Sequence, residues 1–272
     1  ARILKTVDNK TVYSATDLCD HLECLHLTTL KVRDLTEHLP KDAPDDQSQI
    51  IMARGIAHEQ RFLDHLRSSG KTIANLKDLP KDDDQRAHAT MDAIRSGVDV
   101  IYQAYLRDEP FAGYADFLIK STTPSKLGDF SYEVVDTKLA LHAKPLYIIQ
   151  LSLYTEILGK VQGAAPKQMH VVLGDNRRES YLPQDFYHYY CQLKSDFLQH
   201  ITAQPEVYPD PCDHCGVCSF RTLCQTRREK DDHLSQVANI RSSQIRKLAT
   251  AGVLTLAQLA DTKETHIKGV SD

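Results

Sequence analysis

The sequence contains no tryptophan, only 3 methionines and no long apolar run. Within its 272 residues, no stretch approaches the roughly eighteen uncharged apolar residues of a membrane span. The first residues also lack the basic, apolar and small-residue pattern of a secretory signal. No internal repeat or low-complexity segment is present. We therefore expect a soluble, cytoplasmic protein with no membrane partner.

The chain also lacks an excess of basic residues, because its formal net charge is -4. Such a charge argues against a surface coated in lysine and arginine, but it leaves room for a local basic groove. The cysteine count of 7 is odd, and four of these residues crowd between positions 212 and 224. In a chain without signs of secretion, this pattern favours metal ligation over disulfides.

Hydrophobic periodicity predicts an α/β fold in which helices flank a mixed central sheet. We expect two short helices, 242–251 and 255–260, around a turn at Gly252 near the end of the chain. The first predicted helix carries Cys24. The other expected helices cover 16–39, 50–66, 146–158 and 183–201, and the expected strands cover 71–78, 98–106, 111–119, 132–139 and 169–173.

Two aspartates and a lysine lie on neighbouring predicted strands. Side chains alternate along a strand, so Asp136 and Lys138 should point the same way, about 6 to 7 Å apart along the backbone. Asp116 lies on the preceding strand. Hard carboxylate oxygens bind divalent cations that activate water, and an ammonium can offset charge that develops on a phosphate. Because the strand around Asp136 is apolar, a charged pair there needs a reason.

The helices on either side of these strands add candidate residues. His58 is a possible third metal ligand, since a neutral imidazole binds metals well. Glu59 beside it faces elsewhere on the helix and could equally be a solvated residue. Gln150 and Tyr154 are four residues apart on the helix after the Asp136 strand, so they share a face.

Four ordered motifs together resemble the RecB-like branch of the PD-(D/E)XK nuclease superfamily. They are Gly55-x-x-His58, Gly113-x-x-Asp116, Asp136-x-Lys138 and Gln150-x-x-x-Tyr154. The resemblance implies a restriction-endonuclease-like fold and a Mg²⁺ or Mn²⁺ ion held by His58, Asp116, Asp136 and the Thr137 carbonyl. It implies Lys138 as the catalytic lysine, with Gln150 and Tyr154 supporting the substrate and the site.

The spacing Cys215-x2-Cys218-x5-Cys224 is too compact for three independent core cysteines and indicates a soft metal or an iron-sulfur cluster. The residues leave the fourth ligand open. Cys212, with His214 nearby, would suit Zn²⁺, and Cys24 is the distant alternative. Iron-sulfur members of the same nuclease branch join one N-terminal cysteine to three C-terminal ones. That resemblance implies a [4Fe-4S] cluster on Cys24, Cys215, Cys218 and Cys224, with Cys19, Cys191 and Cys212 as non-ligands.

Such a cluster would act as a cysteine-rich staple between the first helix and the C-terminal segment. The stretches 14–18, 23–28 and 232–234 extend the resemblance to a family of RecB-like nucleases over nearly the whole chain. Members of that family often continue into an RNase H-like exonuclease or a helicase region. We therefore expect a nuclease domain over 1–230 and a helical hairpin (HhH-like) module over 231–272 that leads into a further region.

The expected function is a metal-dependent deoxyribonuclease that acts on single-stranded DNA or DNA ends, with a fused or partner helicase. The basic residues Arg221, Arg227, Arg228 and Lys230 could track a phosphate backbone. They fit a solvated helix face equally well, because Glu229 and two aspartates are interspersed. Two other functions remain open from the residues: a non-catalytic DNA-binding module of a helicase-nuclease, and a zinc-stapled adaptor that binds protein.

Overall fold

The computed structural model describes residues 5–7, 10–80 and 82–263. The chain forms two compact units, each assembled from separate stretches of sequence. The first unit contains Ala1–Leu22 and Asp46–Ala203, and the second contains Glu23–Asp45 and Gln204–Asp272. This division does not coincide with the single boundary that we expected at residue 230. Positions 264–272 of the expected hairpin module lie outside the described residues.

The first unit is built on a mixed sheet, which confirms the expected α/β architecture with flanking helices. Among the described residues this sheet has six strands in the order β3-β4-β5-β6-β7-β8. β4, β5 and β6 are antiparallel neighbours at its centre, β3 and β7 join them in parallel, and β8 pairs antiparallel with β7. The strands are β3 (Ile73–Asn75), β4 (Val100–Asp108), β5 (Phe111–Ser121), β6 (Ser131–Thr137), β7 (Met169–Val172) and β8 (Arg178–Tyr181).

Helices supply the crossovers that parallel strands require. α4 (Asp83–Ser96) connects β3 to β4, and α5 (Pro145–Gln162) connects β6 to β7. α5 begins with a proline in its first turn, where the missing N–H is not needed, and ends at Gly163 in the left-handed region, at φ 63°. α5 therefore starts shortly after the Asp136 strand and packs back onto the sheet.

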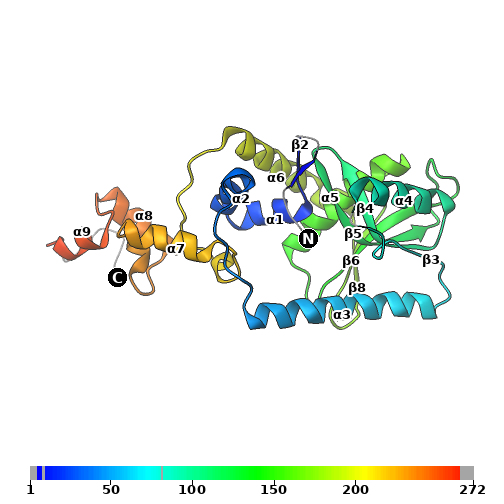
Figure 1. Cartoon of the computed structure of the whole chain (residues 1–272), viewed down its shortest axis with the longest axis horizontal. Coiled ribbons are helices and arrows are strands. Elements are labelled where there is room, and N and C mark those ends of the chain that lie inside the picture. Colours follow the sequence, from blue (N-terminus) through cyan, green and yellow to red (C-terminus); the bar gives the residue numbers. More distant parts are fainter. Residues whose placement is uncertain (1–4, 8–9, 81, 264–272) are drawn as a thin grey trace. The chain divides into compact units, whose positions relative to one another are not determined.

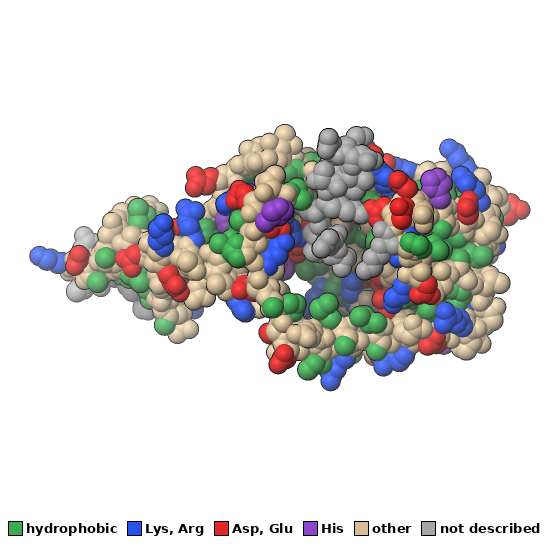
Figure 2. Space-filling model, viewed as in Figure 1, with side chains coloured by type: hydrophobic (Ala, Val, Ile, Leu, Met, Phe, Trp, Pro, Cys, Tyr) green, Lys and Arg blue, Asp and Glu red, His purple; other side chains and the backbone are tan. Residues whose placement is uncertain are grey.

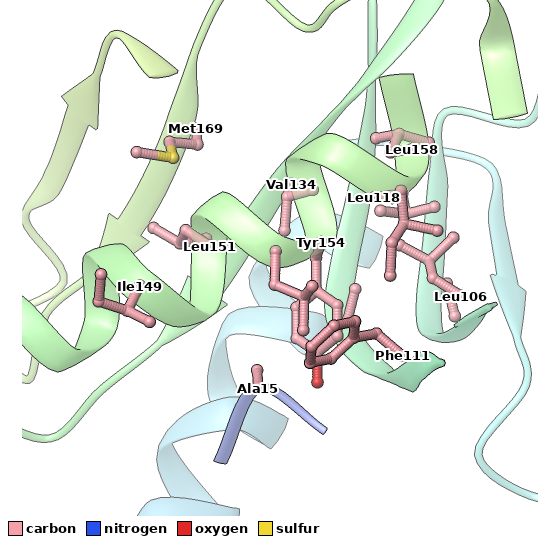
Figure 3. Close-up of a cluster of buried hydrophobic side chains, with 14 of the residues drawn as sticks. Ala15, Leu106, Phe111, Leu118, Val134, Ile149, Leu151, Tyr154, Leu158 and Met169 are labelled. Carbon is pink, nitrogen blue, oxygen red and sulfur yellow. The ribbon is translucent and has the colours of Figure 1, made fainter. Parts of the chain in front are cut away.

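Two apolar clusters show which helices cover each face of the sheet. On one face, α1 (Ala15–Glu23), α4, α5 and α6 (Pro183–Ala203) contribute to a large cluster that includes Leu118 and Val134. On the other face, Leu63 and Leu66 of α3 (Asp46–Ser68) pack on Phe117 and neighbouring residues. Figure 1 shows α3 and α5 on opposite sides of the strands, and Figure 3 shows part of the cluster beneath α5.

Some predicted elements differ from the structure. The first helix is not continuous: Cys24 has an extended backbone (φ -159°, ψ 111°) and is the N-cap residue of α2 (Leu25–Glu37), so our placement of Cys24 on a helix was wrong. The strand expected over 71–78 ends at Asn75, because the Asn75 side chain accepts a hydrogen bond from the Lys77 backbone N–H at 3.0 Å and forms a turn. α4, β8 and the β1 (Lys5–Val7) to β2 (Lys10–Val12) pair were not predicted.

The second unit contains α2 and a series of short helices. The expected turn at Gly252 is confirmed: it has φ 85° and separates α8 from α9. Leu27, Leu30 and Phe220 form a small apolar cluster in this unit, against which Cys24, Cys218 and Cys224 pack. The short helices are η1 (Asp213–Gly216), α7 (Arg221–Lys230), η2 (Leu234–Gln236), α8 (Ser242–Thr250) and α9 (Leu256–Asp261).

None of the helices in the described part of the chain is long and apolar enough to cross a membrane.

Candidate functional site

Asp136 and Lys138 meet at the end of β6. Asp136 is only 3% exposed, and the Lys138 Nζ atom lies 2.8 Å from its Oδ2 atom. The Lys138 side chain is 23% exposed, so the pair is only partly shielded from solvent. The Tyr147 ring adds a cation–π contact with the centroid 5.3 Å from Nζ. The expected common orientation of these two side chains is present.

Asp116 on β5 is oriented by the strand next to it. Its Oδ2 atom accepts a hydrogen bond from the Thr137 backbone N–H at 3.1 Å, and the Thr137 hydroxyl lies 3.3 Å away. The charge of Asp116 acts on both Asp136 and Lys138, which places the two carboxylates close together. Thr137 thus contacts Asp116 through its N–H and its hydroxyl, and the role of its carbonyl as a metal ligand stays a prediction.

Gln150 and Tyr154 present one face of α5 to these charged groups. The Gln150 side chain accepts from Lys138 Nζ at 3.1 Å, and its Nε2 atom lies 3.4 Å from Asp136 Oδ1. Tyr154 is 5% exposed, and Figure 3 shows it within the apolar cluster under α5. A Cβ atom at Gly113 would lie 2.5 Å from the Tyr154 hydroxyl. Gly113, from the second motif, therefore leaves the space that the side chain of Tyr154, from the fourth motif, occupies.

His58 reaches the same end of the sheet from α3. Its side chain is buried, with Nε2 3.4 Å from the Val172 carbonyl oxygen, which also accepts the Lys138 backbone N–H at 2.9 Å. Its Nδ1 atom is buried and has no hydrogen-bond partner among the residues that the structure describes. An imidazole that donates from one nitrogen to a carbonyl leaves the lone pair of the other nitrogen for a metal ion.

The electrostatics of the site follow from burial and crowding. The pKa of Asp136 is raised to about 8: burial is the largest cause, Lys138 opposes it, and the charge of Asp116 adds to it. Burial alone would lower the pKa of Lys138, but the charges of Asp136 and Asp116 outweigh it and raise that pKa. Burial, followed by the charges of Asp116 and Asp136, also raises the pKa of Tyr154. The lysine therefore stays cationic, and a further cation would favour ionised carboxylates.

Two residues of this site were missed in the sequence. Glu59, for which a solvated position was left open, is half-buried, and its Oε1 atom accepts a hydrogen bond from Gln103 Nε2 at 2.8 Å. Burial and the charge of Asp116 raise the pKa of Glu59. The signal was present in the spacing, since Glu59 is in helical register with Phe62, Leu63 and Leu66, the apolar face of α3. Nothing in the sequence marks Gln103.

A hard divalent cation fits the donors at this site. Within the described part of the chain, His58 Nδ1 is buried without a partner, and Asp136 Oδ2 accepts no hydrogen bond of good geometry although Lys138 lies beside it. An imidazole nitrogen with two or three carboxylates is a donor set that suits Mn²⁺ or Mg²⁺. Within the described residues, no three His, Cys, Asp or Glu side chains already stand in a ligand arrangement.

The second unit brings five thiols to one cavity of about 20 Å³. Cys24 joins Cys215, Cys218 and Cys224 there, from the other end of the sequence. Cys212 lines the same cavity, with its Sγ atom 3.9 Å from that of Cys215. The resemblance implied Cys212 as a non-ligand, and its place in this cavity also suits the zinc alternative that the residues left open. Cys19 and Cys191 do not line this cavity.

The thiol environment fits a soft metal or cluster. The Phe220 backbone N–H points to Cys218 Sγ at 3.4 Å, and the Cys212 N–H points to Cys215 Sγ at 3.4 Å. Such N–H groups orient and stabilise thiolates on a metal. Burial and the neighbouring thiols raise the pKa of Cys212 to about 12 in the protein without a metal. A bound cation would reverse that effect.

The four basic residues near the cysteines have mixed surroundings. Arg227 forms an ion pair with Asp231 at 3.0 Å, and Arg228 donates to the Pro209 carbonyl at 2.9 Å and lines the cysteine cavity. Arg221 also lines that cavity, and Lys230 ends α7. In Figure 2, positive and negative side chains are interspersed over the visible face of the sheet-containing unit.

The backbone N–H groups at the start of α9 donate hydrogen bonds to nearby residues of the second unit. The Asp232 carbonyl accepts the Leu256 N–H at 2.9 Å, and the Asp232 carboxylate accepts the Ala257 N–H at 2.9 Å. The Thr255 hydroxyl accepts the Gln258 N–H at 3.2 Å. These N–H groups at the second helix are therefore engaged within the module.

No protein-family model matches this chain, and no curated protein matches it in sequence.

Proposed function

We propose that this protein is a Mg²⁺- or Mn²⁺-dependent deoxyribonuclease of PD-(D/E)XK type that acts on single-stranded DNA or on DNA ends. The observation that carries the proposal is the buried Asp136–Lys138 pair, bridged by Gln150 and placed beside Asp116. An isolated Asp-x-Lys strand on a solvated edge would need no such partners. His58 Nδ1 adds a donor from α3, which covers the face of the sheet opposite to α5.

The roles follow from the contacts. Asp116, Asp136 and His58 would hold the ion, which polarises the phosphoryl oxygen and lowers the pKa of its water. The two aspartates keep Lys138 cationic, and Gln150 accepts a hydrogen bond from its ammonium. Lys138 would orient the attacking water or stabilise the charge that develops on the phosphate. Tyr154 supports this arrangement through its packing on Gly113.

The test is cleavage of labelled single- and double-stranded DNA by the whole protein in Mg²⁺ and in Mn²⁺. The variants Lys138→Gln and Asp136→Asn should each lose on the order of 100-fold in rate, because each removes a group that acts in the transition state. Their matched controls are Lys71→Gln and Asp175→Asn, at exposed positions. Equal activity of the variants and controls would refute the assignment. Metal-independent DNA binding by the folded wild type, without cleavage, would favour a DNA-binding module.

We further propose a structural [4Fe-4S] cluster on Cys24, Cys215, Cys218 and Cys224, supported by the convergence of these thiols in one cavity. After anaerobic purification we expect iron and absorbance near 400 nm, both lost in Cys24→Ser and both retained in Cys19→Ser. The position of Cys212 makes Cys212→Ser the informative third variant. Zinc in place of iron, lost in Cys212→Ser, would support the alternative of a zinc-stapled adaptor.

A further inference from the structure

Gln103 interrupts the regular alternation of β4. It has a left-handed backbone with φ 57°, which is uncommon for a residue other than glycine inside a strand. Strand alternation predicts that Ile101 and Ala104 face opposite sides of the sheet, yet both belong to the cluster under α5. The alternation is broken in the same way on the neighbouring strand β5, where Ala115 and Leu118 both belong to that cluster. Gln103 and Asp116 lie at this irregularity.

At this irregularity the Gln103 side chain lies between two acidic residues, Glu59 and Asp116. The register pairs Tyr102 with Phe117 and Ala104 with Ala115. Between these pairs, the Gln103 Nε2 atom donates to Glu59 Oε1 at 2.8 Å and to Asp116 Oδ1 at 3.2 Å. A side-chain amide has two N–H groups, so one nitrogen can serve both carboxylates.

Asp116 is thereby held from two sides. Thr137 donates to its Oδ2 atom from β6, and Gln103 donates to its Oδ1 atom from β4. Gln103 is neutral, so it separates two carboxylates without adding a charge that would compete with a cation. A left-handed residue costs on the order of 1 kcal/mol, and strain of this kind persists where the surrounding structure holds it.

We infer that Gln103 is a positioning residue of the proposed nuclease: it fixes the Asp116 carboxylate against Glu59 so that Asp116 is preorganised to bind the divalent ion. This inference rests on the proposed function for the identity of the reaction. It concerns orientation only, since Gln103 acts through Asp116. Residues that orient metal ligands typically affect metal affinity by about 10- to 100-fold.

The experiment measures Mn²⁺ binding by isothermal titration calorimetry, with Asp136→Asn identifying the heat that belongs to the site. Gln103→Gly removes the amide and relieves the backbone strain, whereas Gln103→Met removes the amide at nearly constant side-chain length. The matched control is Gln204→Gly, at an exposed glutamine with φ 45° outside the sheet-containing unit. We expect both Gln103 variants to bind Mn²⁺ about 10-fold more weakly or worse, with the control unchanged.

A second readout separates positioning from general stability. If Gln103 positions a metal ligand, cleavage by the Gln103 variants should recover as the Mn²⁺ concentration rises, whatever the change in melting temperature. If Gln103→Gly does not fold, Gln103→Met decides the matter. A folded Gln103→Met protein with wild-type Mn²⁺ affinity would overturn the inference and leave the nuclease proposal standing. Wild type that binds Mn²⁺ tightly but does not cut DNA would overturn the nuclease proposal alone, and wild type that binds no Mn²⁺ would overturn both.

Discussion

The contact between Gly113 and Tyr154 gives a sharp test of how the candidate site is packed. An alanine Cβ at position 113 would lie 2.5 Å from the Tyr154 hydroxyl and 3.1 Å from the nearest ring carbon. Gly113 has no left-handed backbone in the structure, so the objection to alanine is steric only. Tyr154 is 5% exposed and cannot swing into solvent. The hydroxyl would need to move by roughly 1 Å to reach an ordinary contact distance.

Overpacking of this kind costs about 1–3 kcal/mol. Alanine also reduces the entropy of the unfolded chain, which returns about 0.4–1 kcal/mol. We therefore expect Gly113→Ala to lower the free energy of unfolding by about 1.3 kcal/mol, the difference between the midpoints of these two ranges, which are about 2 and about 0.7 kcal/mol. In a Tyr154→Phe background the closest atom is gone and the ring need shift only slightly. There the cost of Gly113→Ala should fall to less than about 0.5 kcal/mol.

The assay is urea unfolding followed by circular dichroism at 222 nm for the two single variants and the double variant. The matched control is Gly159→Ala on α5, where a Cβ would meet its nearest neighbour, Pro166, at 3.4 Å. That substitution should stabilise the protein by about 0.5–1 kcal/mol, because alanine is the better helix former. If Gly113→Ala costs the same with tyrosine and with phenylalanine at position 154, the steric reasoning is wrong.

Two further predictions concern pH and the hairpin module. Burial, with the charge of His200, lowers the pKa of His21 to about 4, from 6.5 in the unfolded chain, so stability should fall as the pH drops through that window. After a discount for partial solvent access, His21→Gln should remove about 1 kcal/mol of this loss of stability between pH 7 and pH 5. Urea unfolding at the two pH values measures the loss, and equal pH dependence in both proteins would contradict the prediction. Asp232→Gly keeps the left-handed backbone (φ 50°) but removes the carboxylate that caps Ala257. Hydrogen exchange at the Ala257 amide should then speed up by the equivalent of about 1 kcal/mol, and unchanged exchange would refute the capping role.

The local chemistry of the site was accessible from the sequence because it depends on short-range geometry. Strand alternation alone placed Asp136 and Lys138 on one side, and helical spacing placed Gln150 and Tyr154 on one face. The apolar residues around Asp136 indicated a buried strand, which the structure confirms. The long periodic helices and central strands were predictable for the same reason.

Features that depend on distant contacts were not predictable. The spacing on α3 puts Glu59 on the apolar face of the helix, but its hydrogen bond to Gln103 depends on a strand far away in the sequence. The left-handed turn at Gln103 has no local signature, since it is held by carboxylates on other elements. The break at Cys24 and the arrival of Cys24 beside the C-terminal cysteines depend on how two remote segments pack.

The sequence by itself determined the sheet-and-helix class and the chemical identity of the central Asp-x-Lys strand, because periodicity and residue type act within a few positions. Only the tertiary structure decided which side chains join that strand. Asp116 is oriented by Gln103 and Thr137, and Tyr154 fits because Gly113 has no side chain. These relations arise from packing across the sheet, where the free energy of each contact depends on atoms far away in the chain.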